Sequence, residues 1–386
     1  GVENPFVGGD LDAVETLLHL LRDSVQQQMV ADVPLGAFLS GGVDSSVIVA
    51  LMQEQSPGKV KTFSIGFNEV GYNEAVQAKS VAEHLGTKHT ELYVTPEQAM
   101  GVIPRLPTLY DEPFSDSSQI PTFLVSEMAQ QYVKVSLSGD AGDELFGGYN
   151  RYIKTDLLWD KIQLVPRWVR QSISKGILST PPAYWNKVGH AATLISGNSG
   201  RWQNLERNIT KLANVLKVDD NNSLYSHFVS NWRDPESIVI NGVERENLVT
   251  HPPLKLDSIV EQMMALDSMT YLSDDILVKV DRAAMGVSLE TRIPFLDHRV
   301  VEFAWRLPQS MKLCDGKTKW ALRQVLYRYV PQELIDRPKM GFGVPIGAWL
   351  RGPLREWAEE LLDELSSNQS NRYMLPVSVL YKMWLI

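Results

Sequence analysis

The sequence predicts an α/β protein built on a parallel, doubly wound sheet with a large helical elaboration. Short apolar runs alternate with segments of helical periodicity four times before Tyr149. Such continuous apolar runs are typical of parallel strands that are buried on both faces. From Arg151 to about Asp267, tryptophans recur among helical stretches and strand signals are few, which predicts mainly helical packing there.

The expected elements follow one another in a regular order. They are a helix over 11–29, a strand over 35–39, a helix over 45–53, a strand over 60–67, a helix over 73–85, a strand over 88–94, a helix over 121–131 and a strand over 133–137. Asn73 is the expected N-cap of the third helix, and Gly86 is expected to end it. Thr95-Pro96 predicts a further helix start, because proline suits the first helical position.

Composition excludes several classes of protein. The chain of 386 residues has a net charge of −9, which argues against nucleic-acid binding. It contains no apolar run long enough to span a membrane, and its start at Gly1 lacks the features of a secretory signal. Because Cys314 is the single cysteine, we expect no intramolecular disulfide and a reducing, cytoplasmic setting. The seven histidines form no cluster with metal-ligand spacing.

The most informative segment is Ser40-Gly41-Gly42-Val43-Asp44-Ser45-Ser46, between a predicted strand and a predicted helix. Its two glycines let the backbone turn tightly and approach an anion. The N-terminus of the helix directs free N–H groups at the loop, which favours bound phosphate. An aspartate beside phosphates calls for a bridging Mg²⁺. The segment contains no Gly-Lys-Ser/Thr, so it is not the lysine-bearing nucleotide loop. A Gly-Gly turn that only opens a helix is the alternative for this segment alone.

A second glycine-rich loop, Ser138–Tyr149, follows the fourth predicted strand. Ligands of open parallel sheets bind outside the carboxyl ends of the strands, so we expect both loops to face one crevice. Asp140, Asp143 and Glu144 repel one another unless a cation or hydrogen-bond donors lie among them. A solvated acidic turn that caps a helix is the alternative.

Two further segments are less specific signals of a functional site. Lys339, within Arg337–Pro345, stands beside glycines and could close over a triphosphate, although lysines beside turns are usually solvated. The charged stretches Lys279–Arg282 and Ser288–Asp297 predict mainly structural ion pairs.

Taken together, these segments resemble the synthetase domain of glutamine-dependent asparagine synthetases, in the ATP-pyrophosphatase superfamily. The resemblance runs from about Leu11 to Trp349. Its carriers are, in order, Ser40–Ser46, Thr62–Phe67, Asp111–Phe114, Ser138–Tyr149, Glu290–Asp297 and Lys339–Gly343. It implies an adenine nucleotide alpha hydrolase-like sheet with a core at about 11–150, a return to the site by 270–345 and a helical region at about 151–269. The first loop alone would leave GMP, NAD and argininosuccinate synthetases and tRNA-modifying enzymes open.

The resemblance implies a ligase that adenylates a carboxylate, most simply the aspartate side chain, and transfers ammonia to it. By similarity, Asp44 and Asp143 hold Mg²⁺, Lys339 neutralises charge on the reacting phosphorus, and Asp140 lies beside the reacting carboxylate. The other implied ATP contacts are Leu39 and Ile65 for adenine, Ser40, Gly41, Gly42, Ser45 and Ser46 for pyrophosphate, Gly139 by the ribose, and Ser138. Asp116 is an implied acceptor contact, and Glu144 and Tyr149 are implied to face the acceptor or the incoming ammonia.

The resemblance also implies the partners. They are the small molecules ATP, a carboxylate acceptor and ammonia from glutamine, with a glutaminase domain or subunit as the source of ammonia. A homodimer is compatible with it, and neither a nucleic acid nor a membrane is expected as a partner.

The sequence departs from the family pattern in ways that keep other substrates open. It starts at Gly1 without the amino-terminal cysteine of a glutaminase domain, and it ends at Ile386, where we expect the C-terminal helices to be incomplete. The segment Ser115–Gln119 lacks the arginine expected for binding free aspartate. A uronic-acid sugar of surface-polysaccharide synthesis or a β-lactam-forming amino acid therefore remains an alternative acceptor. An inactive nucleotide-binding remnant is a third possibility.

Overall fold

The computed structural model describes residues 2–67, 74–196, 205–230, 243, 247–254, 256–336, 344 and 346–367. Asn73 and Lys339, two residues singled out from the sequence, lie outside these ranges. The chain divides into two compact units. The first comprises the described residues of 1–150 and 264–360, and the second those of 151–263 and of the chain after 360.

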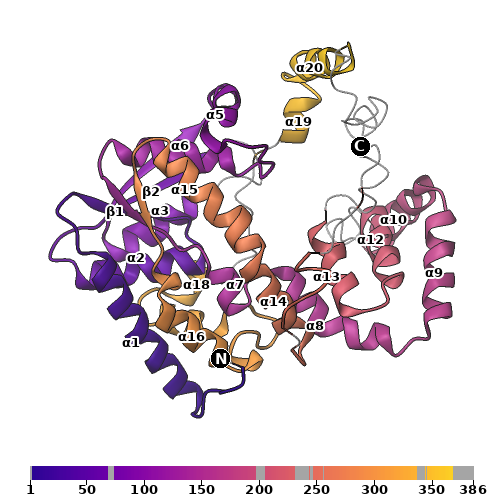
Figure 1. Ribbon diagram of the computed structural model, residues 1–386, viewed down its shortest axis with the longest axis horizontal. Helices are drawn as coiled ribbons and strands as arrows, with labels where there is room; N and C mark the ends of the chain where they lie inside the picture. Colours follow the sequence, from indigo (N-terminus) through magenta and orange to yellow (C-terminus); the bar gives the residue numbers. More distant parts are fainter. Residues whose placement is uncertain are drawn as a thin grey trace. The chain divides into compact units, whose positions relative to one another are not determined.

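The first unit is built on a five-stranded parallel sheet in the order β3-β2-β1-β4-β5. Two of its strands, β1 and β2, are labelled in Figure 1. The strands are β1 (Leu35–Phe38), β2 (Lys61–Phe67), β3 (Lys88–Val94), β4 (Val135–Leu137) and β5 (Glu290–Arg292). The predicted parallel α/β class and its four predicted strands are confirmed. The edge strand β5 was not predicted, because its three residues are charged or polar and lie far along the chain from the other strands. Its Glu290 and Arg292 do form an ion pair, as expected for that charged stretch, with 2.7 Å between Oε1 and Nε.

Both faces of the sheet are covered by helices. Along β2, Phe63, Ile65 and Phe67 belong to a core with α6 (Gln119–Gln130) and α15 (Leu277–Met285). On β1, Ala37 is packed into a second core with α1 (Asp10–Gln28), α2 (Val43–Gln55) and α17 (Trp320–Leu326). Successive side chains of a strand point to opposite faces of the sheet, so each face has its own core. Helices on both faces make the sheet doubly wound.

The remaining helices complete the two units. Among the described residues of the first unit they include α3 (Ala75–Leu85), α4 (Pro96–Met100), α5 (Leu106–Tyr110), α7 (Gly142–Phe146), α16 (His298–Arg306), α18 (Gln332–Ile335), α19 (Ile346–Leu350) and the π-helix η3 (Leu272–Ile276). The second unit contains α9 (Arg167–Ser179), α10 (Pro182–Ser196), α12 (Leu205–Leu216) and α13 (Asn221–Val229). The helices α8 (Asn150–Gln163), α14 (Ile259–Met269) and α20 (Arg355–Ser367) span the boundaries between the two sets of residues.

Local signals read from the sequence set the helix ends of the first unit. Gly86 ends α3 in the left-handed region, at φ 73°, where glycine carries no steric penalty. Thr95 caps α4, and its hydroxyl oxygen accepts a hydrogen bond from the Gln98 N–H at 3.3 Å.

The second unit is helical and has its own small core around Trp159, Val218 and Leu224. The Trp159 indole N–H donates to Asn221 Oδ1 at 2.8 Å, so the buried ring keeps its polar atom satisfied. The tryptophan here is therefore part of the core, as the sequence pattern suggested. Among the described residues of both units, none of the helices has the length and apolarity needed to cross a bilayer.

Candidate functional site

A cavity of about 580 Å³ lies in the first unit, lined by the loops that follow the carboxyl ends of β1 and β4 and by Phe63, Ser64 and Ile65 of β2. Strand ends of a parallel sheet share one edge, so segments distant in the sequence meet there. The two glycine-rich loops face this one cavity, as the sequence predicted. Residues of η3, α15 and the start of α17 line it as well.

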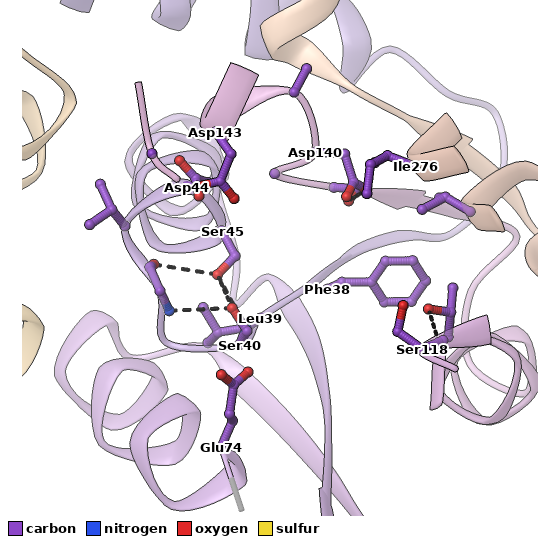
Figure 2. Close-up of a pocket in the computed structure, with 18 of the residues that line it drawn as sticks. Phe38, Leu39, Ser40, Asp44, Ser45, Glu74, Ser118, Asp140, Asp143 and Ile276 are labelled. Carbon is purple, nitrogen blue, oxygen red and sulfur yellow. Dashed lines mark hydrogen bonds between the residues drawn. The ribbon is translucent and has the colours of Figure 1, made fainter. Parts of the chain in front are cut away.

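The first loop holds its serines in a fixed arrangement (Figure 2). The Ser40 N–H donates to Ser45 Oγ at 3.2 Å, the two hydroxyls are 3.0 Å apart, and the Gly42 N–H donates to Ser40 Oγ at 3.3 Å. Gly41 adopts φ 72°, and a Cβ there would lie 2.9 Å from the backbone nitrogen of Ala78. Glycine is therefore required at this position both by conformation and by space. The loop leads into α2, whose N-terminus opens on the cavity.

The second loop packs directly on the first. A Cβ at Gly139 would lie 2.6 Å from the Ser45 backbone nitrogen, and one at Gly142 would overlap the Asp44 carboxylate. Ala141 adopts φ 70°, which turns the chain into α7. The glycines of the second loop thus leave room for the backbone and the acidic side chain of the first.

Asp44 and Asp143, which come from different loops, point toward one another (Figure 2). Lys319 Nζ forms an ion pair with each of them, with Asp44 Oδ2 and, at 2.8 Å, with Asp143 Oδ1. Only 6% of the Lys319 side chain is exposed. Burial by itself lowers the pKa of this lysine, but the two carboxylates outweigh it and hold the pKa above its usual range. Two carboxylate oxygens therefore converge on one cation position.

Lys319 was not identified from the sequence. It precedes α17 with φ 58° and ψ 40°, a left-handed conformation that is uncommon for a lysine and found mostly where the surroundings impose it. The available signal was a lysine close to Gly316, a pattern that solvated surface turns share. Its role depends on contacts 275 residues away in the chain, which no local pattern reveals.

The cavity could hold a metal ion between Asp44 and Asp143. The described residues contain no group of three or more histidine, cysteine or acidic side chains suited to a metal. Mg²⁺, however, is commonly bound by one or two carboxylates together with substrate phosphates. The converging carboxylates of Asp44 and Asp143 lie beside the glycine-rich loop Ser40–Ser46, a phosphate-type loop, and fit that pattern.

Two further carboxyl groups and one phenol in the cavity have raised pKa values. Burial raises the pKa of Asp140, whose Oδ2 accepts a hydrogen bond from the Ser138 hydroxyl at 2.5 Å. Burial, with the nearby Asp143, raises the pKa of Glu144 to about 7. The Tyr149 hydroxyl donates to Glu144 Oε1, and burial also raises the pKa of this phenol. At neutral pH, Glu144 is thus held near the midpoint of its titration.

This shift predicts a pH-dependent stability. A carboxyl whose pKa rises from 4.5 to about 7 on folding stabilises the native state fully below pH 4.5 and loses that contribution as the pH rises through 7. Glu144→Gln removes this titration and serves as the reference. In the metal-free protein, we expect the difference in unfolding free energy, wild type minus Glu144→Gln, to fall by up to about 3 kcal/mol between pH 4.5 and 8. Denaturant unfolding at several pH values measures it. Parallel curves for the two proteins would contradict the shift.

A second ion pair lies at another wall of the cavity. Lys279 Nζ donates to Asp116 Oδ2 at 2.8 Å, while Asp116 Oδ1 accepts from the Ser118 N–H and hydroxyl, each at 2.8 Å. Burial opposes ionisation of Asp116, yet Lys279 and Ser118 hold its pKa below its usual range. Burial and the charge of Asp116 raise the pKa of the neighbouring Asp275 to about 6. Lys279 was expected to serve in structural ion pairing, and it also lines the cavity.

The structure gathers most of the residues singled out from the sequence. The following line the cavity: Leu39, Ser40, Gly41, Gly42, Asp44, Ser45, Ile65, Asp116, Ser138, Gly139, Asp140, Asp143, Glu144 and Tyr149. Ser46 does not, because it is fully buried on another side of α2. Lys339 lies outside the described residues, so its role stays a prediction. Besides Lys279 and Lys319, the cavity includes Glu74, Tyr271 and Arg323, which the sequence patterns did not mark.

A cavity at the carboxyl edge of a parallel sheet, with a glycine-rich loop leading into a helix N-terminus, is the arrangement with which open α/β proteins bind phosphate groups. A family model described as asparagine synthase matches residues 16–384. The chain belongs to the asparagine synthase family.

Individual relatives match almost the whole of this chain. Asparagine synthetase [glutamine-hydrolyzing] 1 of Bacillus subtilis (strain 168) is 33% identical, over 94% of this chain and 54% of the relative. A putative asparagine synthetase [glutamine-hydrolyzing] of Mycobacterium tuberculosis (strain ATCC 25618 / H37Rv) is 35% identical, over 96% and 53%. Amidase chyE of Penicillium rubens is 24% identical, over 91% and 55%. The chain thus spans about half the length of the curated relatives it matches.

Proposed function

We propose that the chain carries the synthetase chemistry of an ATP-dependent amide-forming ligase, which activates a carboxylate with ATP and transfers ammonia to it. Aspartate is the proposed acceptor, and asparagine, AMP and pyrophosphate are the proposed products. One observation carries the proposal: in a chain of this family, Asp44 and Asp143 come from two separate loops and converge on one cation position beside a phosphate-type loop.

The charge of the cavity supports ATP with a divalent cation. Among the described lining residues, six carry carboxyl groups and three are basic, namely Lys279, Lys319 and Arg323. A triphosphate adds about four negative charges, which such a cavity cannot hold without further cations. Mg²⁺ between Asp44 and Asp143 would supply that charge and orient the phosphates when bound.

In the proposed reaction, an oxygen of the acceptor carboxylate forms a bond to the α-phosphorus, and the bond from that phosphorus to the pyrophosphate oxygen breaks. Ammonia then attacks the acyl carbon, the bond to AMP breaks, and a proton is released from nitrogen. The loop at Ser40–Ser45 and the N-terminus of α2 would hold the leaving pyrophosphate through hydroxyl and N–H donors. Keeping both reactants in one cavity replaces bimolecular encounters by local ones.

The Lys279–Asp116 pair favours an amino acid as the acceptor. This wall offers one ammonium and one carboxylate 2.8 Å apart. An amino acid carries both charges, so its carboxylate can face Lys279 while its ammonium faces Asp116. A uronic-acid sugar offers a carboxylate but no ammonium, and it would face Asp116 and Asp140 without compensation. Because the arginine expected within Ser115–Gln119 is missing, Lys279 is the proposed partner of the acceptor's carboxylate.

Acceptor-dependent exchange of labelled pyrophosphate into ATP tests the proposal without any source of ammonia. We expect exchange with Mg²⁺ and aspartate, at least about 10-fold less with succinate, which lacks the ammonium, and none with glucuronate. Exchange with a nucleotide-sugar acid but not with aspartate would move the acceptor to the uronic-acid class. Binding of ATP with no exchange under any carboxylate would reject the ligase chemistry in favour of an idle nucleotide-binding module.

A further inference from the structure

Three charged side chains meet in the cavity. Lys319 is buried and lies with its ammonium between Asp44 and Asp143. Buried carboxylates that approach one another need a cation between them, because desolvation and mutual repulsion both oppose their charge. The cation between these two carboxylates is the ammonium of Lys319.

The surrounding backbone is shaped to keep the lysine in this place. Lys319 occupies the left-handed region, at φ 58°, immediately before α17. A Cβ at Gly148 would overlap both Lys319 Cε and Asp143 Oδ1, so the absence of a side chain there gives the ion pair its room. Residues held in sparsely populated conformations persist only where their surroundings impose them, and they cluster at functional sites.

A divalent ion and this ammonium compete for the same oxygens. Mg²⁺ requires ligand oxygens at about 2.0–2.1 Å in a nearly octahedral arrangement. An ammonium hydrogen-bonded to the same carboxylates repels the ion at close range and draws charge from its ligands. A nucleotide changes this balance, because its phosphates offer the ammonium new partners and the metal new ligands.

We propose that Lys319 is an internal counter-ion that occupies the metal position between Asp44 and Asp143 and yields it only when phosphates arrive. The cation and the nucleotide then enter together, and the displaced ammonium pairs with the phosphates. This inference rests on the proposed function, since it takes ATP as the ligand of the cavity.

Mn²⁺ binding, followed by the loss of the free-ion signal in electron paramagnetic resonance, tests the inference without turnover. We expect Lys319→Met to bind Mn²⁺ in the absence of nucleotide at least about 10-fold more tightly than wild type. Wild type should reach comparable affinity only with the non-hydrolysable analogue α,β-methylene-ATP, after subtraction of the Mn²⁺ that the analogue binds in the absence of protein. Lys279→Met is the matched control, because it removes a buried ammonium from the same cavity but not from these two carboxylates, and it should bind Mn²⁺ within about 3-fold of wild type.

Equal affinities of wild type and Lys319→Met without nucleotide, or an equal gain in Lys279→Met, would overturn the inference. Should Lys319→Met fail to fold by circular dichroism, wild type alone decides. Its thermal midpoint should not move with Mg²⁺ and should rise with Mg²⁺ and the analogue together, whereas a full rise with Mg²⁺ alone would contradict joint entry of cation and nucleotide. Pyrophosphate exchange is measured separately. Absence of exchange would count against the ligase chemistry, whereas the Mn²⁺ affinities and thermal midpoints decide the role of Lys319.

Discussion

Replacing Asp44 by asparagine is expected to reduce acceptor-dependent pyrophosphate exchange by at least about 10³-fold. The substitution keeps the size of the side chain and removes the charge that faces the shared cation position. Stabilising charge at a transferring phosphoryl group is worth several kcal/mol, and each 1.36 kcal/mol is a factor of ten in rate. The measurement is the exchange rate at saturating aspartate over a series of Mg²⁺ concentrations.

The fold of Asp44→Asn should survive, which separates the site from stability. Lys319 keeps its pair with Asp143 at 2.8 Å, and the set of three side chains becomes neutral. Asp32→Asn makes the same change on an exposed turn before β1, at the opposite edge of the sheet, and should exchange at the wild-type rate. A variant Asp44→Asn with more than about a tenth of the wild-type exchange would remove Asp44 from the proposed metal site.

The strands that build the sheet could be predicted because their apolar runs are local. β1 to β4 lie within two residues of the predicted ranges, and Gly86 and Thr95 end and begin helices as expected. β5 was missed because burial on both faces was the signal used, and its side chains are half-buried or exposed. It is a strand because it pairs with β4, which is a long-range contact.

The site divides in the same way. Asp44 and Asp143 were recognisable because each stands in a glycine-rich loop directly after a strand, and parallel topology brings such loops together. Lys319 and the pairing of Lys279 with Asp116 depend on contacts across 275 and 163 residues, so no spacing in the sequence encodes them. Ser46 was assigned to the site from its place in the motif, but the first turn of α2 directs its side chain into the core.

Gly139→Ala is expected to separate the two loops and to reduce exchange by about 100-fold or more. The added methyl would lie 2.6 Å from the Ser45 nitrogen and 2.8 Å from the Asp44 carbonyl carbon. These are backbone atoms at the start of α2, so they cannot turn aside as a flexible side chain would, and one loop must shift. A displacement of about 1 Å at a reacting group can cost about 10²-fold in rate, and overpacking of this kind costs about 1–3 kcal/mol in stability.

The control for this substitution adds the same methyl where there is space. Gly58 is exposed, and a Cβ there would meet nothing within 4 Å, so Gly58→Ala should keep wild-type exchange and stability. Exchange rates and denaturant midpoints of both variants decide the matter. If Gly139→Ala exchanges as well as Gly58→Ala, the close contact of the two loops does not position the reactants, and the convergence of Asp44 and Asp143 loses its structural basis.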